Sequence, residues 1–296
     1  MQDETSPMRA MNTCPICGSS ESAELYRFEL ARWIPSTVVR CNACGTIYKV
    51  PFDLAKPLAS YYDEAYAGLL DWEHDDIGAL PVFTHIRDLM TAELKGSGRA
   101  LLDVGCGPGN FLHLAQEAGF QVTGLELNPI LANRARSRTG AEVIQGDFLS
   151  TELQGRRFDV VTMLDLIEHL QDPVGALKQC RCLLKPGGSL ILYTPNHSSL
   201  IVLIAQAGYR LSGARWSGPV AEIFDCTHVT FFDVRTLGLA VTKAGFGIAK
   251  TIMSRYDPSR TKQAKGFQAS VLKAVEAVSP LVRGQFRILM IVRNPH

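Results

Sequence analysis

Four cysteines near the start of the chain have the spacing of a metal site. The stretches "CPICG" and "CNACG" contain Cys14, Cys17, Cys41 and Cys44 in two copies of CxxCG. Two intervening residues let one tight turn present both thiolates to a single ion, and the following glycine tolerates a positive φ. Four thiolates leave no position for water, so the pattern predicts a structural Zn²⁺ site, with a catalytic or redox site as the alternative. The remaining cysteines lack such spacing and are predicted to be small buried hydrophobic residues: Cys106, Cys180, Cys182 and Cys226.

Three closely spaced glycines follow an apolar run in "LLDVGCGPGNFL". In an open α/β sheet the first turn from strand to helix is rich in glycine, because the backbone there contacts the ligand. We expect Gly105, Gly107 and Gly109 to form such a turn. Glu126 ends the next apolar run, where a carboxylate can accept both hydroxyls of a ribose. The sequence therefore predicts a ligand that carries a ribose.

The spacing of the glycines distinguishes two classes of such ligands. The dinucleotide fingerprint is GxGxxG, whereas this turn reads GxGxG with Asn110 in place of the third close-packing glycine. Asp103 adds an anion just before the turn, which favours a cationic sulfonium over a pyrophosphate. We expect S-adenosylmethionine as the ligand, and a dinucleotide-dependent oxidoreductase is the competing interpretation.

Five apolar runs alternate with helical segments in the rest of the chain, and two more follow after a less regular stretch. The runs are "ALLDVG", "QVTGLEL", "AEVIQGD", "FDVVTML", "GSLILYTP", "FGIAKTIMS" and "FRILMIVRNP". This alternation is typical of βαβ units in a parallel, doubly wound α/β sheet. Between the two cysteine pairs, "SAELYRFEL" and "STVVRC" are predicted to be short strands of a zinc ribbon.

From about residue 80 to the end, the chain resembles the class I S-adenosylmethionine-dependent methyltransferases. The resemblance is carried by "LLDVGCGPGNFL", "GLELNP", "GDF" at 146–148, "FDVVTMLDLIEHLQDP" and "LLKPGGSLILYTPN". It implies a Rossmann-like seven-stranded sheet. The stretch "IEHLQDP" is similar to the small-molecule branch, which includes quinone-biosynthesis O-methyltransferases and methyltransferases for sugars and natural products. Many relatives in this branch also have CxxCG pairs followed by a motif like "SYYDEAY" at 60–66.

The resemblance also implies roles for individual residues. The glycine turn and Asp103 face the methionine part of the cofactor, Glu126 the ribose, and Asp147 with Phe148 the adenine. Asp147 has a competing interpretation as a helix N-cap. The segment after the fourth strand closes over the cofactor. The full set of expected cofactor-binding residues is Asp103, Gly105, Gly107, Gly109, Glu126, Leu127, Asp147, Phe148, Leu164 and Asp165.

A hydroxyl acceptor benefits from a general base, and histidine suits this role because its pKa lies near neutral pH. His169 follows Glu168 in "DLIEHL", and His228 lies in "DCTHVTFF". The resemblance implies a catalytic or metal-holding part for Glu168 and His169. Packing or hydrogen bonding within a loop is the alternative for both histidines, and two adjacent ligands without a clear third make a poor metal site. The other histidines are predicted to be solvated or hydrogen-bonded: His74, His85, His113 and His197.

The chain is predicted to have three parts. Residues 1–50 form the zinc ribbon, residues 51–95 a connector with capping helices, and residues 96–296 the methyltransferase core. An insertion at about 197–224 reads as an apolar helix and a loop with Trp216. We expect either a lid over an apolar acceptor or a helix that packs on the sheet or on a second copy.

Composition and charge narrow the class of partner. The 296 residues are 46% apolar and 20% charged, with a formal net charge of +1, so the positive field usual for nucleic-acid binding is missing. No apolar stretch reaches the roughly 20 residues of a membrane span, and "MQDETSPMRAMN" lacks the features of a secretory signal. We expect a cytoplasmic enzyme with a small-molecule acceptor, and the oligomeric state stays open. The alternatives are a methyltransferase that recognises RNA or protein through the ribbon, and a non-catalytic cofactor-binding protein.

Overall fold

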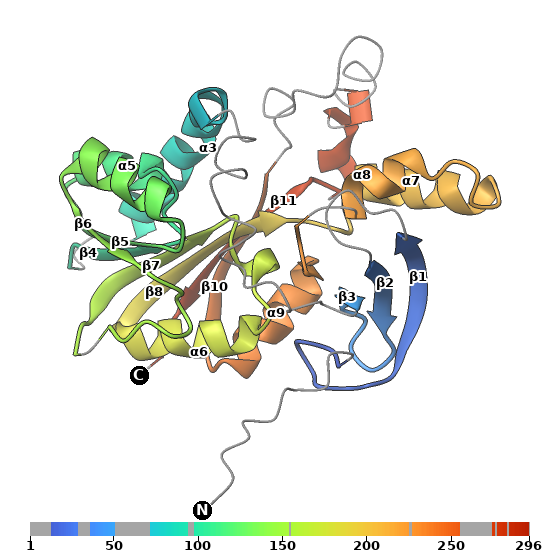
Figure 1. Ribbon diagram of the computed structural model, residues 1–296, viewed down its shortest axis with the longest axis horizontal. Helices are drawn as coiled ribbons and strands as arrows, with labels where there is room; N and C mark the ends of the chain where they lie inside the picture. Colours follow the sequence, from blue (N-terminus) through green and yellow to red (C-terminus); the bar gives the residue numbers. More distant parts are fainter. Residues whose placement is uncertain are drawn as a thin grey trace, which may run out of the picture.

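The computed structural model describes residues 13–28, 36–50, 72–93, 98–153, 155–224, 227–254, 274–275, 277–282 and 284–295. A seven-stranded sheet with the order β10-β11-β8-β7-β4-β5-β6 forms the centre (Figure 1). Its strands are β4 Ala100–Val104, β5 Gln121–Glu126, β6 Glu142–Gln145, β7 Phe158–Leu164, β8 Leu184–Pro195, β10 Gly247–Ser254 and β11 Arg287–Arg293. All seven apolar runs identified in the sequence thus form strands of one sheet.

The sheet is mixed, and its first five strands along the chain confirm the predicted parallel pairing. Strands β4 to β8 are parallel, whereas β11 pairs antiparallel with both β8 and β10. A parallel neighbour of β8 would require a crossover over the sheet. Strand β11 instead runs antiparallel to β8, so that Arg287 at its start pairs with Pro195 at the end of β8. Arg287 therefore lies at the edge where the parallel strands end.

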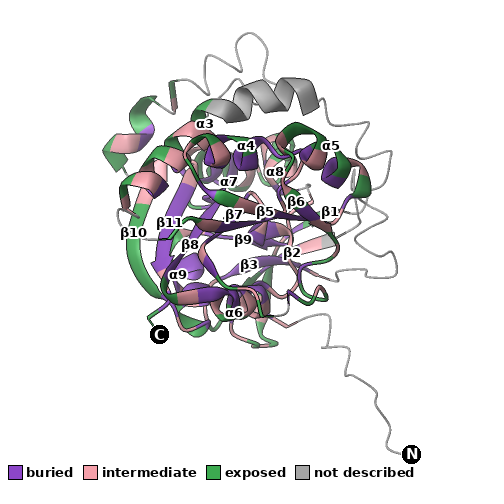
Figure 2. Ribbon diagram, turned by 90° about the vertical axis from the view of Figure 1, so that its left-hand side faces the viewer, coloured by how far each residue is buried: buried purple, intermediate pink, exposed green. Residues whose placement is uncertain are grey.

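Helices cover both faces of the sheet, as the doubly wound prediction requires (Figure 1). Helices α3 Trp72–Glu93, α4 Asn110–Glu117 and α5 Pro129–Thr139 cover one face, and α6 Pro173–Leu183 and α9 Val234–Lys243 cover the other. Alternate residues of β4 serve the two faces: Leu101 packs against α3, α4 and α5, and Leu102 belongs to the cluster that includes residues of α6 and α9. The central strands are buried, and β10 forms an exposed edge (Figure 2).

A second, antiparallel sheet lies next to both cysteine pairs, and Cys41 ends one of its strands. Strands β1 Ser22–Phe28 and β2 Ser36–Cys41 confirm the two strands predicted between the CxxCG motifs, and β3 Ile47–Val50 is an additional strand after the second motif. The fourth strand, β9 Thr230–Phe231, comes from the far end of the chain and pairs Ile47 with Phe231. Strand β9 was not predicted, because two residues carry no readable periodicity. Strands β1 to β3 with the two CxxCG turns, called the ribbon from here on, are thus joined to the core through β9.

The insertion forms two helices, α7 Leu200–Leu211 and α8 Gly218–Phe224, which lie beside the ribbon strands (Figure 1). Val202, Ala205 and Phe224 form one buried cluster with ribbon residues such as Tyr26 and with Phe231 of β9. Tyr26 and Phe224 have ring centroids 5.0 Å apart. The insertion therefore packs on the ribbon and completes its apolar core.

Several expectations about individual segments can now be compared with the structure. Cys106 and Cys180 are buried as predicted, but Cys182 is exposed because it lies on the outer side of α6; Cys226 lies outside the described residues. Most of the predicted connector, residues 51–71 with "SYYDEAY", also lies outside them. In the described part of the chain, no helix is both long and apolar enough to span a membrane.

Candidate functional site

The glycine turn lies between β4 and α4, at the carboxyl end of the strand. All three glycines have positive φ, and the N–H groups of Gly105 and Cys106 donate to the carbonyl of Leu125 at 2.8 and 3.1 Å. A Cβ atom at Gly109 would lie 2.9 Å from Cα of Ala135 in α5, whereas one at Gly107 would meet no atom within 4 Å. Gly109 thus allows α4 to pack closely against α5, the role that the third glycine has in the GxGxxG fingerprint. Gly107 is the glycine that leaves open space beside the backbone.

Glu126 ends β5 next to this open space and is held by backbone N–H groups. Its two carboxylate oxygens accept from Gly107 at 2.9 Å and from Asn128 at 2.8 Å. Burial raises the pKa of Glu126, which is only 8% exposed. A carboxylate has about four lone-pair positions, so two backbone donors leave capacity for two hydroxyl donors. The geometry fits a group that binds the hydroxyls of a ribose.

Asp103 lies deeper than the sequence suggests. It is 2% exposed, and Oγ1 of Thr162 on β7 donates to its carboxylate at 2.6 Å. Burial raises the pKa of Asp103 to about 7, and the neighbouring Glu126 adds to the shift. Asp103 therefore sits beneath the turn, and its role toward a cofactor stays a prediction.

The other residues expected to contact the cofactor differ in their exposure to solvent. Leu127 is half-buried beside Glu126. Asp147 is exposed after β6, where its carboxylate accepts from the N–H of Leu149 at 3.2 Å. Phe148 is buried in the core, and its carbonyl accepts from Gln179 at 2.6 Å. Adenine contacts at Asp147 and Phe148 stay a prediction, and the local hydrogen bond of Asp147 matches the competing interpretation of a turn or cap.

The segment after β7 contains a strained acid. Leu164 is buried, and Asp165 has a φ of 53°. The N–H of Asp165 donates to the carbonyl of Tyr193 at 2.8 Å, and its carboxylate forms an ion pair with Arg287. A positive φ is uncommon for a residue other than glycine and clusters at functional sites. Arg287 was not identified from the sequence, because its position depends on the antiparallel direction of β11.

Glu168, His169 and His228 come together at the same edge of the sheet. Each offers a potential ligand atom, and these atoms all lie within 4.8 Å of one another, which suits a divalent cation as well as acid–base chemistry. The N–H of Val229 donates to the carbonyl of Glu168 at 2.8 Å and so ties the segment before β9 to the short helix η1 Ile167–His169. The imidazoles of His169 and His228 have centroids 4.8 Å apart.

His197 is buried beside the same cluster, so the interpretation of a solvated histidine is wrong for this residue. Its ring centroid lies 6.2 Å from that of His228 and 4.7 Å from that of Phe231. A signal was present in the sequence: His197 follows Pro195 at the end of β8, at the edge where parallel strands place ligand contacts. His85 and His113 are exposed, as predicted, and the side chain of His74 is outside the described part.

Burial shifts the pKa values of this cluster toward the uncharged forms. Burial lowers the pKa of His169 to about 4 and that of His197 to about 3, and burial with the neighbouring imidazoles lowers the pKa of His228 well below its usual range. Burial and the charge of Asp165 raise the pKa of Glu168 to about 8. Glu168 accepts from Oγ1 of Thr194 at 2.9 Å, while its Oε1 has no hydrogen-bond partner in the described residues.

The four cysteines of the ribbon form a second potential site. Their sulfurs lie within 4.8 Å of one another, with Cys14 and Cys44 at 3.5 Å and Cys17 and Cys41 at 3.4 Å. Zn–S bonds of about 2.3 Å place tetrahedral sulfurs about 3.8 Å apart. The arrangement therefore fits a four-thiolate zinc ion.

The comparisons with known sequences point to one family. A family model described as "Methyltransferase domain" matches residues 81–251. Ubiquinone biosynthesis O-methyltransferase from Xanthomonas axonopodis pv. citri (strain 306) is 35% identical over 128 residues, which are 41% of this chain and 53% of that protein. The protein of the same name from Xanthomonas oryzae pv. oryzae (strain PXO99A) is 36% identical over the same length. The chain thus spans about half the length of the curated relatives it matches.

Solved structures share the fold. Magnesium protoporphyrin IX methyltransferase from Synechocystis PCC 6803, solved with bound S-adenosylhomocysteine, has a TM-score of 0.55 at 14% identity and covers 80% of this chain and 97% of its own. A SAM-dependent methyltransferase from Thermotoga maritima has a TM-score of 0.53 at 20% identity, with 79% and 97% covered. Identities this low support the architecture of the seven-stranded domain alone.

Proposed function

We propose, since the chain belongs to the family of methyltransferase domains, that it transfers a methyl group from S-adenosylmethionine to a hydroxyl group of a small molecule. The observation that carries the proposal is the buried Glu126 carboxylate, held by two backbone N–H groups beside the open space at Gly107. Gly107 lets the cofactor approach the backbone, and Glu126 accepts the ribose hydroxyls. The named relatives support oxygen as the acceptor atom.

His169 is the group we assign to the acceptor proton. Its Nδ1 lies 3.3 Å from the carbonyl of Thr227, and a carbonyl only accepts, so Nδ1 carries the hydrogen and Nε2 is the basic nitrogen. S-adenosylmethionine, when bound, supplies an electrophilic methyl group on a sulfonium. The acceptor oxygen would form a bond to that methyl group as the bond from the methyl carbon to sulfur breaks, with S-adenosylhomocysteine as the leaving group. Nε2 of His169 would accept the proton of the acceptor hydroxyl. A phenol, with a pKa near 10, is the acceptor type that a weak base serves best.

The ribbon is proposed to hold a structural zinc ion through Cys14, Cys17, Cys41 and Cys44. The convergence of the sulfurs supports this assignment. Four thiolates leave no open coordination position, so the ion contributes folding energy and takes no part in the reaction.

Calorimetric titration with S-adenosylhomocysteine tests the cofactor. At about 0.3 kcal/mol for each of about 26 heavy atoms, we expect low-micromolar affinity for the wild type. Glu126→Ala should weaken binding at least tenfold, whereas Glu117→Ala, at an exposed position of α4, should not. NADH serves as the competing ligand. Binding of NADH without binding of S-adenosylhomocysteine would show that the turn belongs to an oxidoreductase.

A second experiment tests the base. Transfer of radiolabelled methyl groups to 3,4-dihydroxybenzoate and to catechol is measured for the wild type, for His169→Gln and for His85→Gln, an exposed control. Loss of a general base should lower kcat by about 10²–10⁴ and leave the affinity for S-adenosylhomocysteine unchanged. An unchanged rate at every pH would remove His169 from the mechanism.

A further inference from the structure

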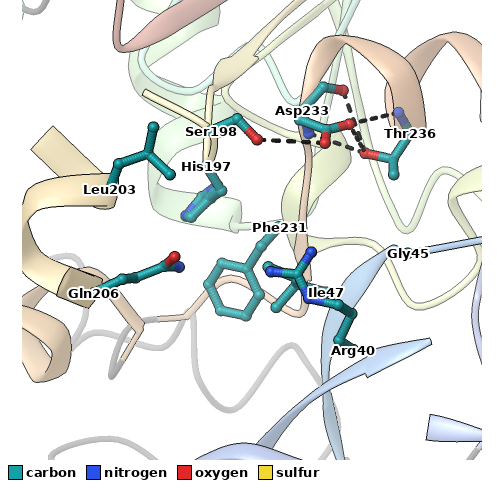
Figure 3. A pocket seen from close by; sticks show the side chains of 10 residues that line it. All are labelled: Arg40, Gly45, Ile47, His197, Ser198, Leu203, Gln206, Phe231, Asp233 and Thr236. Carbon is teal, nitrogen blue, oxygen red and sulfur yellow. Dashed lines mark hydrogen bonds between the residues drawn. The ribbon is translucent and has the colours of Figure 1, made fainter. Parts of the chain in front are cut away.

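A cavity of about 130 Å³ lies between the ribbon, helix α7 and strand β9. Arg40 and Ile47 line it from the ribbon, Gln206 from α7, His197 from the end of β8 and Phe231 from β9. In Figure 3, Arg40, Gln206 and His197 surround the ring of Phe231. The ribbon and the insertion, which are far apart in the sequence, are both needed to close this cavity.

Two largely buried polar side chains, Gln206 and His197, line the cavity. Gln206 is 7% exposed, and its side-chain amide forms no hydrogen bond with any residue that the structure describes. His197 is 5% exposed, and its Nδ1 likewise has no partner in that part of the chain. Nδ1 of His197 is fully buried and therefore out of reach of a ligand in the cavity, whereas the Gln206 amide lines the cavity and can donate to a ligand there.

The charges around the cavity favour an anionic ligand. The guanidinium of Arg40 forms no ion pair or hydrogen bond with another described residue, and Nζ of Lys49 lies 5.9 Å from the ring centroid of Phe231. Asp233 also lines the cavity, but its carboxylate already accepts from the N–H of Thr236 at 2.7 Å as the N-cap of α9. Arg40 is thus the charged group that is available to a ligand.

The size of the cavity and the character of its walls restrict the ligand further. A cavity of about 150 Å³ admits a benzene ring. Phe231, Ile47 and Leu203 provide apolar walls, and a carboxylate can accept from the fork of a guanidinium and from an amide NH₂ group.

We propose that this cavity binds a carboxylate on a six-membered ring, with Arg40 and Gln206 as its partners, as the recognition end of the methyl acceptor. The ring of His197 lies 6.2 Å from His228, which lies 4.8 Å from His169, so the cavity adjoins the cluster assigned to the reaction. The conclusion that the bound carboxylate belongs to the methyl acceptor rests on the proposed function. The conclusion that the cavity binds a ring carboxylate does not depend on that function. The same chemistry would also fit a free ring carboxylate that acts as an effector.

Binding of benzoate to the full chain tests the site without any activity. Side-chain amide resonances of ¹⁵N-labelled protein are followed with benzoate and with neutral benzamide. We expect benzoate to shift the Gln206 NH₂ resonances with a Kd of about 1 mM, typical for so small a ligand. Arg40→Gln, at an exposed position, should weaken benzoate at least tenfold, and Arg210→Gln, an exposed arginine outside the cavity, should not. Equal binding of benzamide, or no shift at Gln206, would overturn the proposal.

Measurements of methyl transfer distinguish a ring carboxylate that is the methyl acceptor from one that is an effector. If the ring carboxylate is the acceptor, Arg40→Gln should raise KM for 3,4-dihydroxybenzoate at least tenfold and leave both kcat and KM for catechol unchanged. If benzoate binds but KM is unaffected, the cavity holds an effector and the acceptor assignment is wrong. If S-adenosylhomocysteine fails to bind while benzoate does, the proposed function fails and the binding site stands.

Discussion

Two alanine substitutions in the glycine turn should have opposite consequences for stability and for binding. Both Gly107 and Gly109 have a left-handed backbone, with φ of 54° and 87°, which costs another residue about 1–2 kcal/mol. At Gly107 a Cβ would meet nothing within 4 Å, so we expect no additional loss of stability. At Gly109 the 2.9 Å approach to Cα of Ala135 adds an overpacking term of about 1–3 kcal/mol.

Cofactor affinity should show the reverse order. The open space at Gly107 is where we place the ligand, so a methyl group there should weaken S-adenosylhomocysteine at least tenfold, or about 1.4 kcal/mol. The methyl group of Gly109→Ala points into α5 and does not reach that space. We therefore expect Gly109→Ala to lose about 2–5 kcal/mol of unfolding free energy and to keep most of its affinity while folded.

Urea unfolding followed by circular dichroism gives the free energies, and calorimetric titration gives the affinities, both below the unfolding transition. Wild-type affinity in Gly107→Ala would refute the assignment of the turn to the cofactor. A greater stability loss in Gly107→Ala than in Gly109→Ala would contradict the packing argument itself.

Two further predictions concern burial and metal. Asp103 has a pKa of about 7 in the folded chain, above the value near 3.9 expected when unfolded, so its contribution to stability falls as pH rises between these values. As the pH rises from 5 to 8, the unfolding free energy of Asp103→Asn should therefore increase relative to that of the wild type, on the order of 2 kcal/mol. A difference in urea midpoint between the two proteins that stays constant with pH would contradict the burial argument. Cys44→Ser should lose the proposed zinc ion and have a lower melting temperature, whereas Cys182→Ser, at an exposed cysteine, should change neither. Metal analysis measures the zinc content, and thermal unfolding measures the melting temperature. Full zinc occupancy in Cys44→Ser would exclude the site.

The parts of the fold with local signals could be predicted from the sequence. Each strand of the central sheet is an apolar run, and the glycine turn and Glu126 are separated by one βαβ step, so their meeting at the carboxyl edge follows from the parallel pairing of β4 and β5. The four cysteines also came together as their spacing indicated. In these cases the pattern and the contact lie within one supersecondary unit.

The remaining contacts depend on register between distant segments. Arg287 reaches Asp165 because β11 runs antiparallel to β8, a direction that its apolar pattern does not encode. Phe231 reaches Ile47 through a strand of only two residues. Gln206 reads as one polar position on an apolar helix, and its place in a cavity becomes visible only when α7 packs on the ribbon.

These distant contacts make the ribbon a structural part of the site. Cys41 and Cys44 stand next to Arg40 and Gly45, which line the cavity, and β3 holds β9, whose preceding residue Val229 donates to Glu168. A metal ion bound by the two CxxCG turns would therefore also fix the wall of the cavity and, through β9, the position of His228 beside His169. If the ribbon were only a recognition device for a macromolecule, its β3 edge would not need to be occupied by a strand of the core. The pairing of β3 with β9 therefore favours a ribbon that shapes the binding of a small acceptor.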